Sequence, residues 1–460
     1  MLPPDQQGRF RRPCVLLLQS LYGHPESGHN WQLHCNLQLS KLGYREVAPG
    51  SSTFVHANGS VLVVYVDDFL LSTKTELMAG EWSRVASLID LGAPEPLHRF
   101  LGCTYLRERR PAADDNKHTI TKFTYDMEDY TISTVEAYLA VAPAGTTLKR
   151  VTTPFVTESD GPAGRPPATW EEMLSDVITA EKEPLIRGAL APHAAAVLMK
   201  ALWAARVGRP DISVAVVRLA RRITTWGVKE DQELHRLISY LHSTPTLKLE
   251  GEVHSDSTTW TIRCFADADF VSQGDTSCKS TSGMFVVLES GPPDDRRSFP
   301  LSWCAKKQSS VARSTPEAEL AAASSAIFGS LIPLSIIFNE TTGGEIPCVV
   351  EEDNSAAELI INKGYSAALR YLSRTHRVSI AAMSEALHAG HYQLRHCNSS
   401  DMRGDTLTKT FTAAQWPAAL ELILMRQTKS TSTAPAATGR SSSTSSSASQ
   451  LPANKKKKPK

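Results

Sequence analysis

The chain has 460 residues, of which 41% are hydrophobic and 21% charged, the composition of an ordinary globular protein with length for roughly two to four domains. The formal net charge is +1, and since residues 427–460 hold seven basic and no acidic residues, the rest of the chain carries −6. The bulk charge therefore excludes a generally basic protein. A case for nucleic-acid binding needs a local basic cleft and has to come from motifs.

The eight cysteines are scattered without a CxxC pair, and the N-terminus is polar and Pro-rich rather than signal-like. We therefore expect a cytoplasmic or nuclear protein that is not secreted. Residues 320–338 form the most membrane-like stretch, nineteen residues without a charge. Because this stretch contains Gly329, Pro333 and several serines, it predicts a buried helix, and we expect no membrane partner.

Turn signals separate short apolar runs in the first 110 residues. The runs expected to form strands are 14–18, 53–56 and 60–67. The Asn58-Gly59 step between the last two predicts a β-hairpin. Residues 31–42 place apolar residues among polar ones and predict a helix.

The middle of the chain predicts a helical connector. Loops are expected at 111–117 and 158–167. Helices are expected at 189–213, 212–225 and 230–241.

A new pattern begins at residue 259. The expected elements are strands at 261–266, 283–289 and 301–305, a helix at 316–328, a strand at 347–352 and then further helices. Three strands followed by alternating helix and strand predict an α/β fold around one mixed sheet. After Arg426 the sequence is rich in Ser, Thr, Ala and Pro and ends in a lysine run, which predicts a disordered basic tail.

The first notable acids are the pair in Tyr65-Val66-Asp67-Asp68, between two apolar runs at a predicted hairpin tip. An isolated Asp-Asp pair most simply makes the turn. In this context, however, the motif resembles the polymerase motif of reverse transcriptases. Further motifs in the order and spacing of copia-type LTR retrotransposon Pol polyproteins are Ser20-Leu21-Tyr22-Gly23, Trp31, Gly43-Tyr44, Phe100-Leu101-Gly102 and Arg209-Pro210-Asp211-Ile212-Ser213. The resemblance covers about residues 10 to 412.

This resemblance implies RNA-directed DNA polymerase ancestry, with Asp67 as a Mg²⁺ ligand and Asp68 and Tyr65 beside it. The family's other essential aspartate lies on an earlier palm strand, which we expect to be missing from this sequence. The family also follows its Leu-Tyr-Gly step with a Lys-Gln pair, where this chain has His24-Pro25-Glu26-Ser27. The change removes donors and adds negative charge beside phosphates, so we expect the chain alone not to polymerise DNA.

Four more acids are spread over about 140 residues and fall at strand ends and helix starts. Asp267 follows the strand 261–266, and Glu319 lies in the first turn of a helix for which Ser314 or Thr315 would be the N-cap. Asp353 ends the strand 347–352, and Asp405 comes late in the fold. Singly, such acids do no more than favour a helix dipole. Together at one sheet edge they would repel, unless divalent cations neutralise them as in two-metal phosphodiester hydrolysis.

The surrounding motifs resemble copia-type ribonuclease H domains. They are Asp267-Ala268-Asp269, Lys279-Ser280-Thr281-Ser282-Gly283, Ser302-Trp303, Lys306-Lys307-Gln308, Ser314-Thr315-Pro316-Glu317-Ala318-Glu319, Asp353-Asn354-Ser355-Ala356 and Asp405 before Leu407-Thr408-Lys409. The resemblance implies catalytic, metal-binding roles for Asp267, Glu319, Asp353 and Asp405, with two Mg²⁺ ions, or Mn²⁺ in their place. Asp269, Glu317 and Asp401 are neighbours that could be mistaken for them.

Two departures from the family bear on activity. Pro316 stands just before Glu317, where proline suits a helix start. The family's Lys-His-Ile-Asp step is replaced by the segment from Arg374 to Ser379, so an acid is absent while positive charge remains. We expect Arg374, with Lys306 and Lys307, to contact the nucleic-acid backbone.

The expected architecture is α/β: a truncated reverse-transcriptase palm and connection, then a ribonuclease H-like mixed sheet with flanking helices. The expected domains are a partial palm at 10–110, a thumb-like connection at 111–257, a ribonuclease H-like domain at 258–412 and a disordered Ser-rich basic tail at 427–460.

The expected activity is Mg²⁺-dependent hydrolysis of RNA in RNA–DNA hybrids, with RNA template, DNA and other Pol chains as partners. Two alternatives stay open. A non-catalytic transposon remnant is favoured by the missing palm strand and opposed by the four retained acids. A host-adopted nucleic-acid-binding module would keep its hybrid binding when those acids are replaced.

Overall fold

The computed structural model describes residues 20–21, 23–112, 118–156, 186–270 and 278–427. The expected strand at 14–18, the loop at 158–167 and, apart from Gln427, the basic tail lie outside these residues. The described residues up to Gln427 belong to one compact unit. The domain boundaries within it remain predictions.

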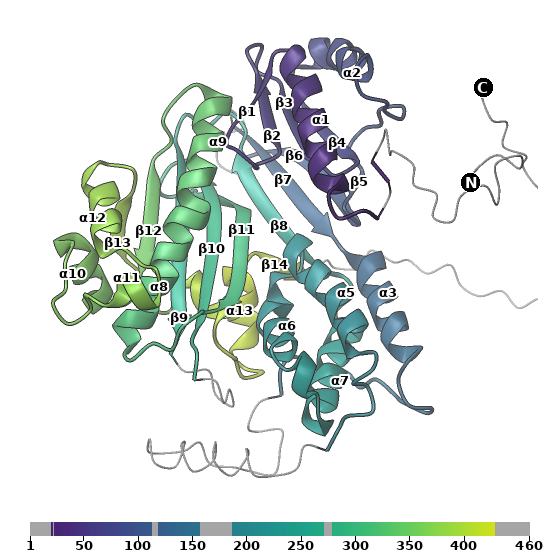
Figure 1. Cartoon of the computed structure of the whole chain (residues 1–460), viewed down its shortest axis with the longest axis vertical. Coiled ribbons are helices and arrows are strands. Elements are labelled where there is room, and N and C mark those ends of the chain that lie inside the picture. The colour runs from purple at the N-terminus through teal and green to yellow at the C-terminus, as the bar shows by residue number, and fades with distance from the viewer. Residues whose placement is uncertain (1–19, 22, 113–117, 157–185, 271–277, 428–460) are drawn as a thin grey trace, which may run out of the picture. The chain divides into compact units, whose positions relative to one another are not determined.

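The first sheet, here called the hairpin sheet, has four antiparallel strands in chain order. Its strands are β1 (Tyr44–Glu46), β2 (Thr53–His56), β3 (Val61–Tyr65) and β4 (Asp68–Ser72), and its helices are α1 (Ser27–Lys41) and α2 (Met78–Ala86). Helix α1 lies beside the strands (Figure 1). Leu39, Leu62 and Val85 join helices and strands in one buried core. The predicted hairpin is confirmed, with Gly59 at φ 85° in its turn. The predicted helix at 31–42 is also confirmed, beginning four residues earlier, at Ser27.

The second, central sheet has five antiparallel strands in the order β14-β8-β7-β6-β5. The strands are β5 (Arg99–Phe100), β6 (Cys103–Pro111), β7 (Thr119–Asp126), β8 (Leu247–His254) and β14 (Met425–Gln427). The sequence did not predict this sheet. One reason is that β6 exposes most of its residues, including four charged ones in a row, and so lacks a clear apolar alternation.

Four helices of the predicted connector pack into a shared hydrophobic core. They are α3 (Glu128–Leu139), α5 (Ala194–Val207), α6 (Ser213–Ala220) and α7 (Val228–Ser243). The predicted helix at 189–213 is shorter than expected, because Gly208 follows its last residue and Pro210 begins a separate short turn.

The Arg-Pro-Asp motif after α5 has a structural role. Arg209 and Asp211 form a fully buried ion pair, and the Tyr240 hydroxyl donates to Asp211 over 2.9 Å. The Trp416 indole of α13 (Trp416–Leu422) in turn donates to the Tyr240 hydroxyl over 3.2 Å. Removing one member would leave a buried charge or donor without its partner, so this network ties the connector to the C-terminal helix.

The third sheet is mixed, with strand order β11-β10-β9-β12-β13. Its strands are β9 (Trp260–Asp269), β10 (Thr281–Ser290), β11 (Arg297–Lys307), β12 (Cys348–Glu352) and β13 (Gln393–His396). The first three pair antiparallel, while β12 is parallel to β9 and β13 is parallel to β12. The predicted mixed sheet and α/β class are thus confirmed. The strand predicted at 261–266 is longer than expected, so Asp267 lies inside β9 rather than after it.

Five helices accompany the mixed sheet: α8 (Thr315–Ala326), α9 (Ile332–Thr342), α10 (Ser355–Lys363), α11 (Leu372–Thr375) and α12 (Ile380–His388). A π-helical turn joins α8 to α9, and the continuous helix Thr315–Thr342 is long and apolar enough to cross a membrane by length and composition alone. The predicted burial is confirmed for α8, whose Leu320 and Ala323 are 0% exposed in the core. In α9 no residue is fully buried, but Ile332, Leu334 and Phe338 are partly buried against the same core.

Candidate metal centre

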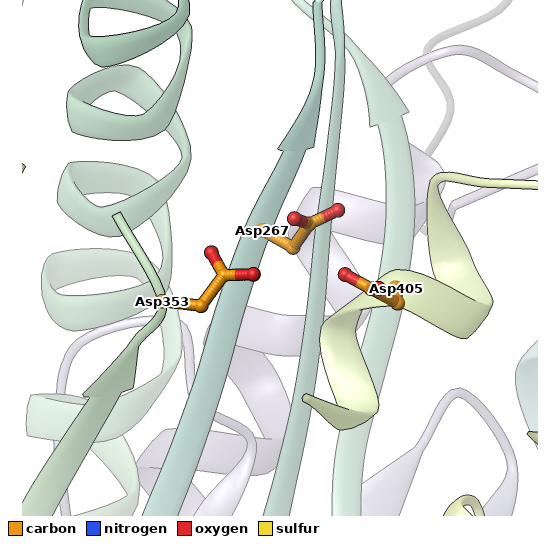
Figure 2. Close-up of side chains that lie close together, drawn as sticks. All are labelled: Asp267, Asp353 and Asp405. Atoms are coloured by element: carbon orange, nitrogen blue, oxygen red, sulfur yellow. The ribbon is translucent and has the colours of Figure 1, made fainter. Parts of the chain in front are cut away.

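Three of the four acids singled out in the sequence converge at one end of the mixed sheet. Asp267 comes from β9, Asp353 follows β12, and Asp405 lies in a short 3-10 helix, Arg403–Leu407. Each offers a carboxylate oxygen, and these oxygens lie within 4.8 Å of one another. Figure 2 shows the three side chains directed toward a common space. Within the described residues, this is the group of acidic, histidine or cysteine side chains with the spacing of metal ligands.

Two glycines allow the segment carrying Asp405 to approach β9. A Cβ atom on Gly404 would lie 2.8 Å from the Asp267 Cβ and 3.1 Å from its backbone nitrogen. A Cβ atom on Gly283, which pairs with Asp267 across the β9–β10 ladder, would lie 2.6 Å from Thr408 Cγ2. Real Cβ atoms do not approach other atoms so closely, so only glycine fits at both positions.

Asp353 is oriented by a cap and a neighbouring hydroxyl. The Asn354 side chain caps α10 by accepting from the backbone N–H groups of Ala356 and Ala357, each over 3.0 Å. The Ser399 hydroxyl donates to Asp353 Oδ2 over 3.1 Å. The expected strand-to-helix step at Asp353 is therefore confirmed.

Asp267 is 1% exposed and receives donors from the two residues that end the Leu-Thr-Lys motif. The Thr408 hydroxyl donates to Asp267 Oδ2. The Lys409 ammonium lies 3.3 Å from Asp267 Oδ1 and 2.6 Å from Asp405 Oδ1. Burial and the charge of Asp267 raise the pKa of Asp405, while Lys409 lowers it.

Glu319 lies beside the three aspartates but is not among the side chains that meet within 4.8 Å. It sits on α8, whose N-cap is Ser314, one of the two caps predicted, with Pro316 in the first turn. Glu319 is 4% exposed, and its Oε2 has no hydrogen-bond partner. Burial raises its pKa, and so do the charges of Asp267, Glu352 and Asp353. This environment disfavours a bare carboxylate and would suit one that faces a cation.

Glu317 lies two residues before Glu319 on α8 and so on a different face of that helix. Its carboxylate accepts from the Tyr371 hydroxyl over 2.8 Å and from the Arg313 backbone over 2.9 Å. These contacts indicate a structural role for Glu317, which agrees with its exclusion from the predicted ligands.

Glu352 is a buried acid that the sequence analysis did not single out. It is 0% exposed, its Oε2 has no hydrogen-bond partner, and burial raises its pKa. The run Glu351-Glu352-Asp353 at a strand end could have signalled it. Neighbouring strand residues face opposite sides of a sheet. Glu351 pairs with Arg263 on one side, so Glu352 faces the other.

The carboxylates of this centre fit divalent cations. Oxygen ligands are those that Mg²⁺ prefers, and a nearby cation would lower the cost of charge on Glu319 and Glu352, whose Oε2 atoms have no hydrogen-bond partner. We therefore treat the three aspartates and Glu319 as the residues that would hold such ions.

Two of the basic side chains expected to contact nucleic acid lie on β11, an edge strand of the same sheet. Lys306 and Lys307 of β11 pair with Ser282 and Thr281 of β10, which in turn pair with Ala268 and Asp269 of β9. Arg221, at the end of α6, adds a guanidinium that donates to Thr281 Oγ1 over 2.6 Å. One strand, β10, therefore separates the paired lysines from β9, which carries Asp267.

Arg374 and Ser379 belong to the segment that departs from the family pattern. Arg374 is exposed on α11. Ser379 caps α12 by accepting from the Ala382 N–H over 3.1 Å. Since serine and aspartate cap helices about equally well, Ser379 can fill the capping role that an acid would have at this position.

The polymerase-like motif has contrasting surroundings. Val66 and Asp67 form the turn between β3 and β4, with Val66 at φ 57° and its carbonyl accepting from the Trp31 indole over 2.6 Å. Tyr65, Asp67 and Asp68 are exposed. Among the described residues, neither aspartate joins a group with metal-ligand spacing.

Sequence comparison relates the chain to transposon proteins. It is 24% identical over 398 residues to the "Retrovirus-related Pol polyprotein from transposon RE1" of Arabidopsis thaliana and 24% identical over 420 residues to that from transposon RE2 of the same plant. It is 24% identical over 430 residues to that from transposon TNT 1-94 of Nicotiana tabacum. These matches cover 85%, 88% and 91% of this chain but only 24%, 25% and 28% of the relatives, so the chain spans about a quarter of their length. No family model matches.

Comparison with solved structures finds foamy virus proteins among its matches. The solution structure of the PFV RNase H domain covers 36% of this chain and 93% of its own, with 14% identity and a TM-score of 0.22. The crystal structure of Prototype Foamy Virus Protease-Reverse Transcriptase covers 37% of this chain and 22% of its own, with 13% identity and a TM-score of 0.19. These TM-scores are too low to support a fold assignment, which rests instead on the strand order described above.

Proposed function

Because the chain is a relative of the copia-type Pol polyproteins, in a segment that resembles reverse transcriptase and ribonuclease H, we propose that it is a ribonuclease H-type endonuclease. Its reaction would be Mg²⁺-dependent hydrolysis of the RNA strand in RNA–DNA hybrids, leaving a 3′-hydroxyl. The observation that supports this most directly is the convergence of Asp267, Asp353 and Asp405 within 4.8 Å at the end of a ribonuclease H-like sheet.

Asp267, Asp353, Asp405 and Glu319 would hold the divalent cations, Mg²⁺ or Mn²⁺. When bound there, two such ions supply an activated water and stabilise charge at the leaving oxygen. The protein's own part is to fix the ligands, with Thr408 and Ser399 donating to Asp267 and Asp353. Hydrogen bonds of this kind hold the ligand carboxylates in one orientation and so define where ions would bind.

The substrate strand would run across the end of the mixed sheet. Lys306, Lys307 and Arg374 would contact the phosphate backbone, which gives affinity without base identity. The choice of hybrid over DNA would rest on groove shape and on contacts with 2′-hydroxyl groups. RNA template, DNA and other Pol chains are the partners that this proposal implies.

The test is cleavage of a labelled RNA–DNA hybrid by the full chain in Mg²⁺, compared with Asp353→Asn. The substitution keeps the shape of the side chain and removes the charge, so cleavage should be lost. Asp401→Asn is the matched control, because Asp401 is an exposed aspartate outside the converging group, and cleavage should persist. A folded wild-type chain that binds the hybrid without cutting it would instead favour a non-catalytic remnant or binding module.

A further inference from the structure

Lys409 holds an unusual place at the metal centre, because its ammonium contacts two of the proposed ligands at once. The nitrogen lies 2.6 Å from Asp405 Oδ1 and 3.3 Å from Asp267 Oδ1. The two acids come from chain segments 138 residues apart. Lys409 thus joins two of the residues that would hold a cation.

The charges around this space explain why a cation belongs there. Three aspartates lie within 4.8 Å of one another, and the buried carboxyl groups of Glu319 and Glu352 lie close enough to interact with their charges. Like charges so close repel strongly in a partly desolvated site. A single ammonium between Asp267 and Asp405 offsets part of this repulsion.

The Lys409 side chain is also free to leave. It is 41% exposed, whereas Asp267 is 1% exposed. A lysine carries its charge on a flexible four-carbon stem, so the ammonium can move into water without disturbing the backbone. Asp267 and Asp405, by contrast, are fixed by the close approach at Gly404.

We propose that Lys409 is a built-in counter-ion that holds Asp267 and Asp405 together when no metal is bound and competes with divalent cations for these two carboxylates. The inference rests on the metal site of the proposed function and adds to it a device that tunes metal affinity. Binding of an ion between the two aspartates would displace the ammonium, because the two positive charges repel each other at that distance.

The experiment measures metal binding rather than cleavage. Mn²⁺ and Mg²⁺ are titrated calorimetrically into the metal-free full chain, its Lys409→Met variant and its Lys409→Arg variant. Lys409→Met keeps the apolar stem but removes the charge, so both ions should bind on the order of tenfold more tightly. In EDTA the same variant should melt at a lower temperature, by roughly 2 °C, because the acids lose their counter-ion. Lys409→Arg keeps the charge and should bind ions nearly as the wild type does.

Lys363→Met is the matched control, since Lys363 is an exposed lysine at the end of α10, and it should leave metal affinity unchanged. Unchanged or weaker metal binding by a folded Lys409→Met variant would overturn the proposal and make Lys409 a simple surface partner or an organiser of the ligands. Absence of metal binding by the wild type would overturn the metal site together with it. Metal binding without hybrid cleavage would reject the nuclease activity while leaving the counter-ion proposal standing on its affinity data.

Discussion

The hairpin sheet and the mixed sheet each carry an acidic motif, but the surroundings of the acids differ. Asp67 and Asp68 are neighbours in sequence, lie at an exposed turn and join no group of ligands within the described residues. Asp267, Asp353 and Asp405 come from three distant segments and meet within 4.8 Å. Water solvates the charges of the exposed pair. The charges of the converging acids repel one another in a partly buried site, so their arrangement favours a bound cation.

The comparison shows that the acidic turn of the hairpin sheet and the acidic site of the mixed sheet depend on different parts of the structure. The Tyr-Val-Asp-Asp motif specifies a local conformation, a tight turn with Val66 at φ 57°. A β-branched residue there is strained, and strain of this kind persists where surrounding contacts hold it, as the Trp31 hydrogen bond does here. The site of the mixed sheet depends instead on long-range packing. Mutations should therefore act differently on the two regions.

The largest expected effect is on hybrid cleavage. Asp267→Asn removes one ligand charge and should lower the initial cleavage rate by about a thousandfold, since a bound metal contributes several kcal/mol of transition-state stabilisation. Asp67→Asn on the hairpin should change the same rate less than twofold. The measurement is single-turnover cleavage of a labelled hybrid in Mg²⁺. Equal losses in both variants would show that the two acidic regions work as one site.

The next effect is on stability. Gly404→Ala places a Cβ 2.8 Å from the Asp267 Cβ, against β9, and should lower the free energy of unfolding by about 1–3 kcal/mol. Gly329→Ala is the control, because nothing lies within 4 Å of its added Cβ. That variant should be neutral or slightly stabilising, as alanine favours a helix. Urea unfolding followed by circular dichroism gives both values, and equal stabilities would refute the close-packing argument.

The Gly404 contact also shows where sequence reasoning stops. The acids at 267, 319, 353 and 405 could be selected from their motifs, and the caps at Ser314 and Asn354 follow from local rules. The close approach of the Gly404 segment to β9 could not be predicted, because it depends on which atoms meet across the sheet. For the same reason Glu352 was missed: its burial follows from the packing of both faces of β12.

The central sheet was missed for a different reason. Strand β6 is mostly exposed and charged, and its Arg110 is paired with Glu252 of β8, two strands away. A polar strand is stabilised by hydrogen bonds to its neighbouring strands rather than by a buried face. Those partner strands can lie far away in the sequence, so local patterns do not predict the pairing. Strand β13 has the same character, with one apolar residue in four. Buried strands such as β10 were predicted because their apolar runs are continuous.

A pH effect should distinguish the buried acids from exposed ones. A carboxyl group whose pKa is raised by folding contributes stability that is fully present below its unfolded value, near 4.5 for Glu319, and lost as the pH rises through the folded value. The metal-free chain should therefore lose stability from about pH 4.5 upward. Glu319→Gln should remove part of this loss and raise the free energy of unfolding at pH 8 by about 1–2 kcal/mol. Thermal melts in EDTA at several pH values test this, and Mg²⁺ should narrow the difference between variant and wild type.

The smallest expected effect concerns the acid that the family pattern has and this chain lacks. If that position serves only to cap α12, its identity should matter little so long as the side chain can accept from the Ala382 N–H, as Ser379 does over 3.1 Å. Ser379→Asp should leave the free energy of unfolding within about 0.5 kcal/mol, whereas Ser379→Ala should lower it by about 1 kcal/mol. Hybrid cleavage should be the same in both variants and in the wild type. A gain of cleavage in Ser379→Asp alone would instead place this position with the converging aspartates, and an acid would then be missing from the site itself.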